Sequence, residues 1–166
     1  SLVRDVEIDY WGSMTPLYQV ANISTPDATQ IVIKPYDKNQ LKEIANARKR
    51  AISQAWKQER IRVENGMGTR DWTPEQQKEL LSKKTVTDYE GHHMRSVSNG
   101  TTYNEQLEIA GDKNNIQFLE KSKANNEHLR AHGGNTRNRT NGYYDVDAGK
   151  MHDFGSNPPQ APEAKN

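Results

Sequence analysis

Four of the five histidines in this 166-residue chain form two pairs whose spacing suits metal binding. His128 and His132 are four residues apart, and a helix would bring both onto one face with their Cβ atoms about 5–6 Å apart. His92 and His93 are adjacent. One of them can supply a third metal ligand, and the other is then left beside the metal, where it can act as a base. Such a layout suits metal-dependent hydrolysis of a phosphodiester.

Composition restricts how a metal could be held. The chain has no cysteine, so disulfides and thiolate zinc sites are excluded. Neutral imidazoles suit Zn²⁺ and Ni²⁺ and tolerate Mg²⁺ less well. We therefore predict one divalent metal ion (Zn, Ni or Mg) bound by His92, His128 and His132, with a position open for water or phosphate. The alternative for the spaced pair alone is a helix surface that happens to carry two histidines.

His93 is the predicted general base. Neighbouring residues of a strand point to opposite sides unless a bulge intervenes, so one histidine would meet the metal and the other the attacking water. An imidazole with an unperturbed pKa of ~6.5 is mostly neutral at physiological pH, as a base must be.

The elements that must position these residues follow from apolar spacing. Alternation bounded by turn residues predicts three strands, over residues 6–10, 17–23 and 30–34. Apolar residues at three- and four-residue steps predict a long helix over 38–63, with Asp37 as its N-cap. A shorter helix over 74–84 is expected to begin with a capping box at Thr73.

The second half of the chain predicts a hairpin followed by a helix. Residues 85–98 and 114–119 read as the two arms, with one helical turn at 105–110 in the polar loop between them. A helix over 122–132 is expected to end at the glycine pair that follows it. The remainder is rich in Asn, Gly, Pro and charge, which is typical of a disordered tail.

Four segments of this half match a known pattern in order and spacing. They are Trp72-Thr73-Pro74, Tyr89-Glu90-Gly91-His92-His93, Asp112-Lys113-Asn114-Asn115-Ile116-Gln117-Phe118-Leu119 and Glu127-His128-Leu129-Arg130-Ala131-His132-Gly133-Gly134. About residues 47–142 resemble the GHH-signature toxin nucleases, a branch of the HNH superfamily, and are similar to the colicin-type DNases. The resemblance implies a metal-dependent endonuclease toxin that cleaves DNA with low sequence specificity. RNA stays open as a substrate.

The resemblance also implies roles for residues outside the metal set. Asn115 matches the asparagine whose carbonyl holds the base in one tautomer, with Asn114 as the alternative. Glu90 is expected to orient an arginine near the phosphate or to support a metal ligand, although a solvated surface glutamate is an equal alternative. Basic residues around the histidines are candidate nucleic-acid contacts: Arg95, Arg70, Lys121 and Arg130. The basic run over 48–62 reads equally well as a solvated helix face.

The first part of the chain carries a second resemblance. Tyr10-Trp11-Gly12-Ser13-Met14-Thr15-Pro16-Leu17, Gln19-Val20-Ala21-Asn22-Ile23 and Ile33-Lys34-Pro35-Tyr36-Asp37-Lys38 are similar to the small β-rich domain of ribosome recycling factor. This resemblance covers residues 2–45. The rest of that domain and the three-helix bundle have no counterpart here, so recycling activity is not implied. A ribosome-associated binding module without catalysis is the alternative function.

Together these observations predict an α+β chain with three parts. Residues 1–45 form a partial β-rich segment, 46–142 a helical lead-in and a ββα-metal (HNH, treble-clef-like) core, and 143–166 a disordered tail. We expect a cognate immunity protein and a toxin that is secreted or delivered, as part of a larger protein, into the cytoplasm of a target cell. Because the first residue is Ser rather than Met, we expect an internal start, such as that of a fragment of a longer protein. No apolar run approaches the about 20 residues that cross a bilayer.

Overall fold

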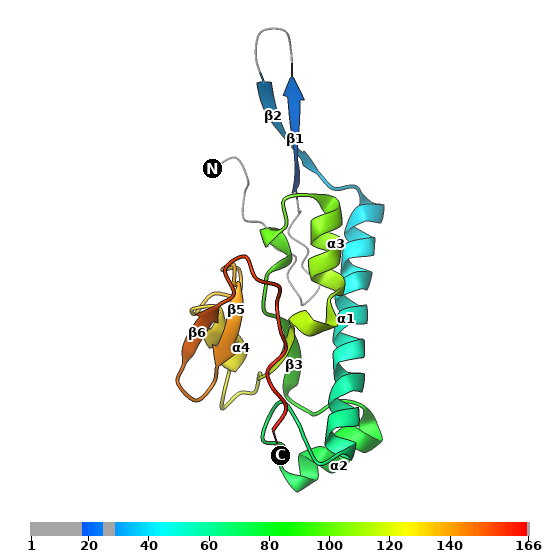
Figure 1. Ribbon diagram of the computed structural model, residues 1–166, viewed down its shortest axis with the longest axis vertical. Helices are drawn as coiled ribbons and strands as arrows, with labels where there is room; N and C mark the ends of the chain where they lie inside the picture. Colours follow the sequence, from blue (N-terminus) through cyan, green and yellow to red (C-terminus); the bar gives the residue numbers. More distant parts are fainter. Residues whose placement is uncertain (1–17, 25–28, 166) are drawn as a thin grey trace.

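The computed structural model describes residues 18–24 and 29–165, and these confirm the α+β class (Figure 1). Strands β1 (Tyr18–Ser24) and β2 (Thr29–Pro35) pair antiparallel, in register from Tyr18 opposite Pro35 to Ser24 opposite Thr29. They confirm two of the three strands predicted for the first part of the chain. The third, over residues 6–10, lies outside the described residues. No helix in the described ranges is long and apolar enough to cross a membrane.

Helix α1 (Lys38–Glu64) begins and ends where local chemistry predicts. The Asp37 carboxylate accepts a hydrogen bond from the Gln40 backbone N–H at 2.8 Å, and the Gln40 side chain accepts one from the Asp37 N–H at 3.1 Å. This reciprocal pair satisfies two backbone donors that the helix itself leaves without partners. The helix ends at Asn65, and Gly66 follows with a φ of +74°.

Helix α2 (Pro74–Lys83) also begins with a capping box, formed by Thr73, and has Pro74 at its first position. The hairpin follows, with β3 (Tyr89–His93) antiparallel to β4 (Ile116–Glu120). Between its arms lie the 3-10 turn η1 (Val97–Asn99), helix α3 (Tyr103–Gly111) and the 3-10 turn η2 (Lys113–Asn115). Helix α3 is longer than the single turn predicted there.

An apolar core joins α1 to one face of the hairpin. Its buried members are Ala51, Ala55, Trp56, Val63, Trp72, Leu80, Val86, Ile116 and Phe118. The ring of Trp56 stacks on Phe118 with centroids 3.9 Å apart. Gly91 lets α1 approach β3 closely, because a Cβ there would lie 2.9 Å from a methyl of Ile52. Gly91 therefore lies on the face of β3 that meets the helix.

Helix α4 (Glu127–Ala131) is shorter than the predicted helix over 122–132. The start of that range is a turn instead, because the Ser122 hydroxyl accepts from the Asn125 N–H at 3.0 Å and the Ser122 N–H donates to the Asn125 carbonyl. Asn126 then caps the helix, with its side chain accepting from the Leu129 N–H. Because the side chains of Ser122 and Asn126 bond to backbone groups, the helix begins about one turn later in the sequence than predicted.

The prediction of a disordered tail over 143–166 is wrong for the part that the structure describes. Strands β5 (Gly142–Asp145) and β6 (Lys150–Asp153) form an antiparallel hairpin. Near the end of the chain, Lys165 exchanges two backbone hydrogen bonds with Gly68, at 2.7 and 2.9 Å. This order comes from contacts that are distant in sequence, which composition does not reveal. In Figure 1, α4 and β5–β6 lie on the side of β3 opposite α1.

Candidate metal centre

Three histidines from two elements meet beneath the surface. His92 comes from β3, His128 from α4, and His132 directly follows α4. All three are buried, with exposed fractions of 3%, 8% and 7%. One ring nitrogen of each lies within 4.8 Å of the other two, and the ring centroids are 4.8–5.2 Å apart. The structure therefore brings together the three residues that spacing had singled out.

The hydrogen bonds of these rings leave nitrogen lone pairs for a cation. Nε2 of His92 and Nδ1 of His128 are buried and have no hydrogen-bond partner among the described residues. Nδ1 of His132 lies 2.8 Å from the Asn138 carbonyl oxygen. A carbonyl only accepts, so this nitrogen carries the hydrogen and Nε2 keeps the lone pair. A backbone carbonyl behind the ring is a common support for a metal-binding imidazole.

Burial also keeps the three rings neutral. It lowers the pKa of His92 well below its usual value, with the neighbouring histidines as a further cause. Burial, and to a smaller extent the neighbouring His132, lowers the pKa of His128 from 6.5 to about 4. Burial also lowers the pKa of His132. Metal ligands must be deprotonated. Three neutral, converging imidazoles with unused nitrogens therefore fit a divalent metal such as Zn²⁺ or Ni²⁺.

His93 lies on the other face of β3, as strand alternation requires. Its ring is 4% exposed, and Nε2 is 2.8 Å from the Ala110 carbonyl oxygen. That nitrogen must carry the hydrogen, so Nδ1 holds the lone pair, and it is buried with no partner in the described ranges. Burial, then the charge of Arg48, lowers the pKa of His93 to about 3.

The expected contact between Asn115 and this base is not what the described residues show. The Asn115 side chain accepts from the Arg95 N–H at 2.7 Å and donates to the carbonyls of Arg95 and Ile109 at 2.9 and 3.3 Å. Those three bonds use its oxygen and both amide hydrogens. It therefore ties the chain after β3 to η2, while the Ala110 carbonyl sets the His93 tautomer. Asn114, the alternative, is exposed and donates its N–H to Asp112.

Glu90 lies on the His92 face of β3, two residues earlier. It is half-buried, and its Oε2 atom is buried without a hydrogen-bond partner among the described residues. Burial raises the pKa of this carboxyl group, and the charge of Lys121 acts in the opposite direction. This placement next to a metal-ligand candidate fits a supporting role better than a solvated surface position.

Two of the four predicted nucleic-acid contacts are engaged inside the protein. Arg70 forms a two-pronged ion pair with Glu127, at 2.8 and 3.1 Å. Arg95 donates to the Asn141 side chain at 2.7 Å and to the carbonyls of Gly155 and Asn157. Arg95 thereby fastens the C-terminal segment to the chain after β3. Neither guanidinium is positioned for substrate phosphate without giving up these bonds.

The other basic residues near the histidines are Arg130, Lys121 and Arg48, and they lie in different surroundings. Arg130 is exposed on α4 and donates to the Asn125 side chain at 2.6 Å. Lys121 lies close enough to His128 to lower its pKa. Arg48, on α1, lowers the pKa of all four clustered histidines and was not singled out from the sequence. The signal that pointed to it was the basic run over 48–62, which also fits a solvated helix face.

Comparison with known proteins now places the chain. Residues 38–120, half of the chain, match the family described as GHH signature containing HNH/Endo VII superfamily nuclease toxin. The chain belongs to this family. The description of the family names a nuclease toxin, which implies a nuclease of the HNH/Endo VII type. The matched range contains His92 and His93 and ends before His128, whose place beside His92 comes from the structure.

The first part of the chain matches a different family. Residues 1–56 match ribosome recycling factor, so the two matches overlap over residues 38–56, within α1. The ribosome-recycling factor of Nostoc sp. is 57% identical over 47 residues, which is 28% of this chain and 26% of that protein. Teneurin-3 of Danio rerio is 36% identical over 88 residues, 52% of this chain and 3% of that protein. The chain thus spans only a small part of the curated relatives it matches.

Proposed function

We propose that the chain is a metal-dependent endonuclease that hydrolyses phosphodiester bonds in DNA with low sequence specificity. The observation that carries this proposal is the buried trio of His92, His128 and His132, with unused ring nitrogens, in a member of a nuclease family. Low sequence specificity is what the resemblance to the colicin-type DNases implies. RNA is the alternative substrate of the same chemistry.

Each residue has a distinct task in this proposal. The trio holds the metal, which when bound stabilises charge on the phosphate and on the departing oxygen. His93 takes a proton from the attacking water at Nδ1. The Ala110 carbonyl keeps the other hydrogen on Nε2 and stabilises the imidazolium that forms. Glu90 supports the face of β3 that carries His92.

The burial of His93 has a consequence for this mechanism. With a pKa of about 3, the ring is a weak base in the substrate-free protein. A bound phosphate would bring negative charge to the ring and raise its pKa, because an opposite charge favours the protonated form. We propose that substrate binding both opens a path for water to Nδ1 and strengthens the base.

Biological context follows from the family. We propose that the domain acts in the cytoplasm of a target cell after delivery as part of a larger toxin, and that the producing cell holds a cognate immunity protein. Lys121, Arg130 and Arg48 are the proposed phosphate contacts, because their charges lie beside the histidines or on the exposed face of α4.

The decisive experiment incubates supercoiled plasmid with purified protein, with and without chelator, beside His93→Ala and a control. The matched control is His152→Ala, which removes an exposed histidine that pairs with Asp145 away from the trio. We expect cleavage by the wild type and by the control, loss with chelator, and loss in His93→Ala. Cleavage by His93→Ala at the wild-type rate would remove His93 from the mechanism.

A ribosome-associated binding module is the second candidate, favoured by the match of residues 1–56 to ribosome recycling factor. It predicts salt-sensitive co-sedimentation with ribosomes and no cleavage of plasmid. Cleavage with no co-sedimentation would eliminate it.

A further inference from the structure

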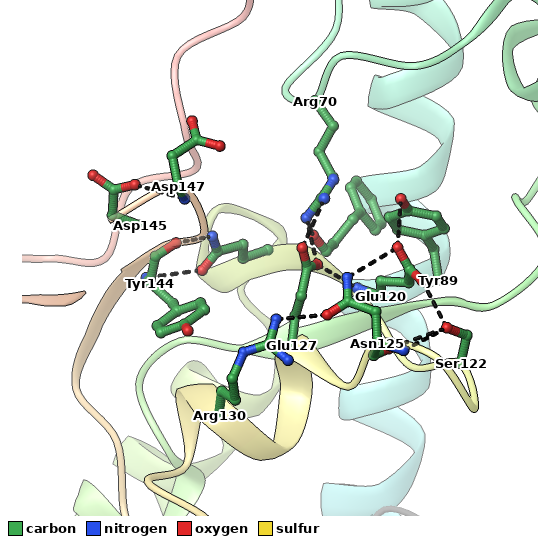
Figure 2. A network of polar contacts seen from close by, with 12 residues as sticks. Arg70, Tyr89, Glu120, Ser122, Asn125, Glu127, Arg130, Tyr144, Asp145 and Asp147 are labelled. Atoms are coloured by element: carbon green, nitrogen blue, oxygen red, sulfur yellow. Dashed lines mark hydrogen bonds and ion pairs between the residues drawn. The ribbon is translucent and has the colours of Figure 1, made fainter. Parts of the chain in front are cut away.

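Arg70 links three parts of the molecule (Figure 2). It lies between α1 and α2, outside the hairpin and α4, and its side chain is 18% exposed. Its guanidinium donates to both carboxylate oxygens of Glu127, at 2.8 and 3.1 Å, and to the Phe118 carbonyl at 3.0 Å. The same group lies 4.9 Å from the centroid of the Tyr89 ring. It therefore contacts β3, β4 and α4 at once.

Glu127 occupies the other end of this link. It is the first residue of α4, directly precedes His128, and is 5% exposed. One of its oxygens also accepts the Glu120 backbone N–H at 2.7 Å. The carboxylate thus fastens the start of α4 to the end of β4.

The metal-ligand candidates come from the elements that this link joins. His92 belongs to β3, whereas His128 and His132 belong to α4 and its end. A five-residue helix is too short to be stable alone, so its position depends on such contacts. We propose that Arg70 and Glu127 are positioning residues that hold α4 against the hairpin and thereby set the metal affinity. This inference rests on the proposed metal centre.

A purely structural role is the competing explanation, and the type of contact argues against it. Buried ion pairs are often replaceable by apolar residues of similar volume without loss of stability. A planar guanidinium bound through two parallel bonds instead gives directional placement. The pair is therefore better suited to fixing geometry than to adding stability.

The chain offers a matched control on α1. Glu59 is fully buried and accepts from the Trp72 indole at 2.8 Å and the Thr69 N–H at 2.7 Å. Like Glu127, it is a buried carboxylate with several donors. Both of these partners, Trp72 and Thr69, lie in the segment between α1 and α2. Glu59→Gln should disturb folding without moving the metal ligands.

The test titrates metal-free protein with Co²⁺ and records affinity and the visible absorption of the bound ion. The variants are Arg70→Lys, the double substitution Arg70→Met with Glu127→Met, and Glu59→Gln. Arg70→Lys keeps the charge and loses the two-pronged bond. The double substitution leaves no unpaired buried charge, so it keeps the fold testable if Arg70→Lys does not fold. Thermal unfolding without metal is measured for each.

We expect both Arg70 variants to bind Co²⁺ about 10–100-fold more weakly, the range typical when groups that support ligands are lost. Their Co²⁺ absorption should also change, while Glu59→Gln should lose thermal stability and keep both the affinity and the absorption. Wild-type Co²⁺ affinity and spectrum in the folded double variant would overturn the positioning role alone. Absence of Co²⁺ binding in the wild type would instead overturn the proposed metal centre and this inference with it.

Discussion

The two faces of the β3–β4 hairpin are built in different ways. Toward α1, the strands present Gly91, Ile116 and Phe118 to an apolar core with stacked aromatic rings. Toward α4, they present His92 and Gln117, and among the described residues the apolar cluster there has three buried members: Leu119, Ala131 and Tyr144. The α1 face is held by burial of apolar area, whereas the α4 face depends on hydrogen bonds, one ion pair and, in our proposal, a metal.

Hydrogen bonds on the α4 face replace much of the missing apolar contact. The Gln117 side chain donates to the Tyr144 carbonyl at 2.7 Å and accepts a hydrogen bond from the Tyr144 N–H at 3.1 Å. Its amide group thus joins β4 to β5 through the two bonds that a backbone amide of a neighbouring strand would make. Figure 2 shows Tyr144 beside the network of Glu127 and Arg130 that holds α4. The α1 face thus provides most of the apolar packing and also carries His93, whereas the α4 face carries the metal-ligand candidates.

The largest expected effect is the loss of metal binding in His128→Ala. This change removes one of three ligands, so a divalent metal should raise the thermal unfolding midpoint of the wild type and leave that of the variant unchanged. Calorimetric titration and thermal unfolding, each with and without metal, measure this. Unchanged metal affinity in both His128→Ala and His132→Ala would contradict the assignment of the site.

The adjacent histidines should fail in different ways. His93→Ala should lower the cleavage rate about 10²–10⁴-fold, the usual loss for a general base, while metal affinity stays the same. His92→Ala should lose metal binding and cleavage together. Metal affinity and cleavage rate measured for both variants make the distinction. The opposite pattern would mean that the faces of β3 carry the reverse roles.

Removal of the core aromatic Trp56 tests the α1 face. Trp56→Ala should lower the free energy of unfolding by about 3–5 kcal/mol, because it leaves a cavity against Phe118 and Trp72. Urea unfolding in the presence of chelator gives this value without a contribution from metal. Leu129→Ala, at a side chain that is 36% exposed on α4, is the control and should change little. An equal decrease in the free energy of unfolding in Trp56→Ala and Leu129→Ala would contradict the proposed contrast between the two faces.

Acid should weaken the metal-free protein through the α4 face. The pKa of His128 is about 4 in the folded chain and 6.5 ordinarily, so the unfolded state binds the proton first. The stabilising contribution of the neutral ring is complete above about pH 6.5 and is lost as the pH falls toward 4. Urea unfolding at pH 7 and pH 5 should show this, with a shallower decline in His128→Ala. A decline of the same steepness in that variant would place the acid sensitivity elsewhere.

Much of this molecule was predictable from the sequence because its causes are local. The limits of α1 and α2 follow from capping residues within four positions of each helix end, and apolar steps define the faces they bury. The histidine spacing likewise predicted that His128 and His132 would join one of the adjacent pair, since an i, i+4 pair needs only one helical turn and strand alternation separates His92 from His93. Which of the two joins them came from the structure.

Other features depended on partners far along the chain. The C-terminal hairpin is ordered through Arg95, whose partners lie 46 to 62 residues away, and the start of α4 through Arg70, 57 residues from Glu127. Asn115 has the residue type predicted for it but different partners. A side chain's type shows what bonds it can make, and only the tertiary structure decides which groups come within reach. The sequence by itself therefore determined α1, α2 and the metal-ligand candidates, because their causes are local. The fold decided the limits of α3 and α4 and which residues hold the histidines in place, because those contacts join distant parts of the chain.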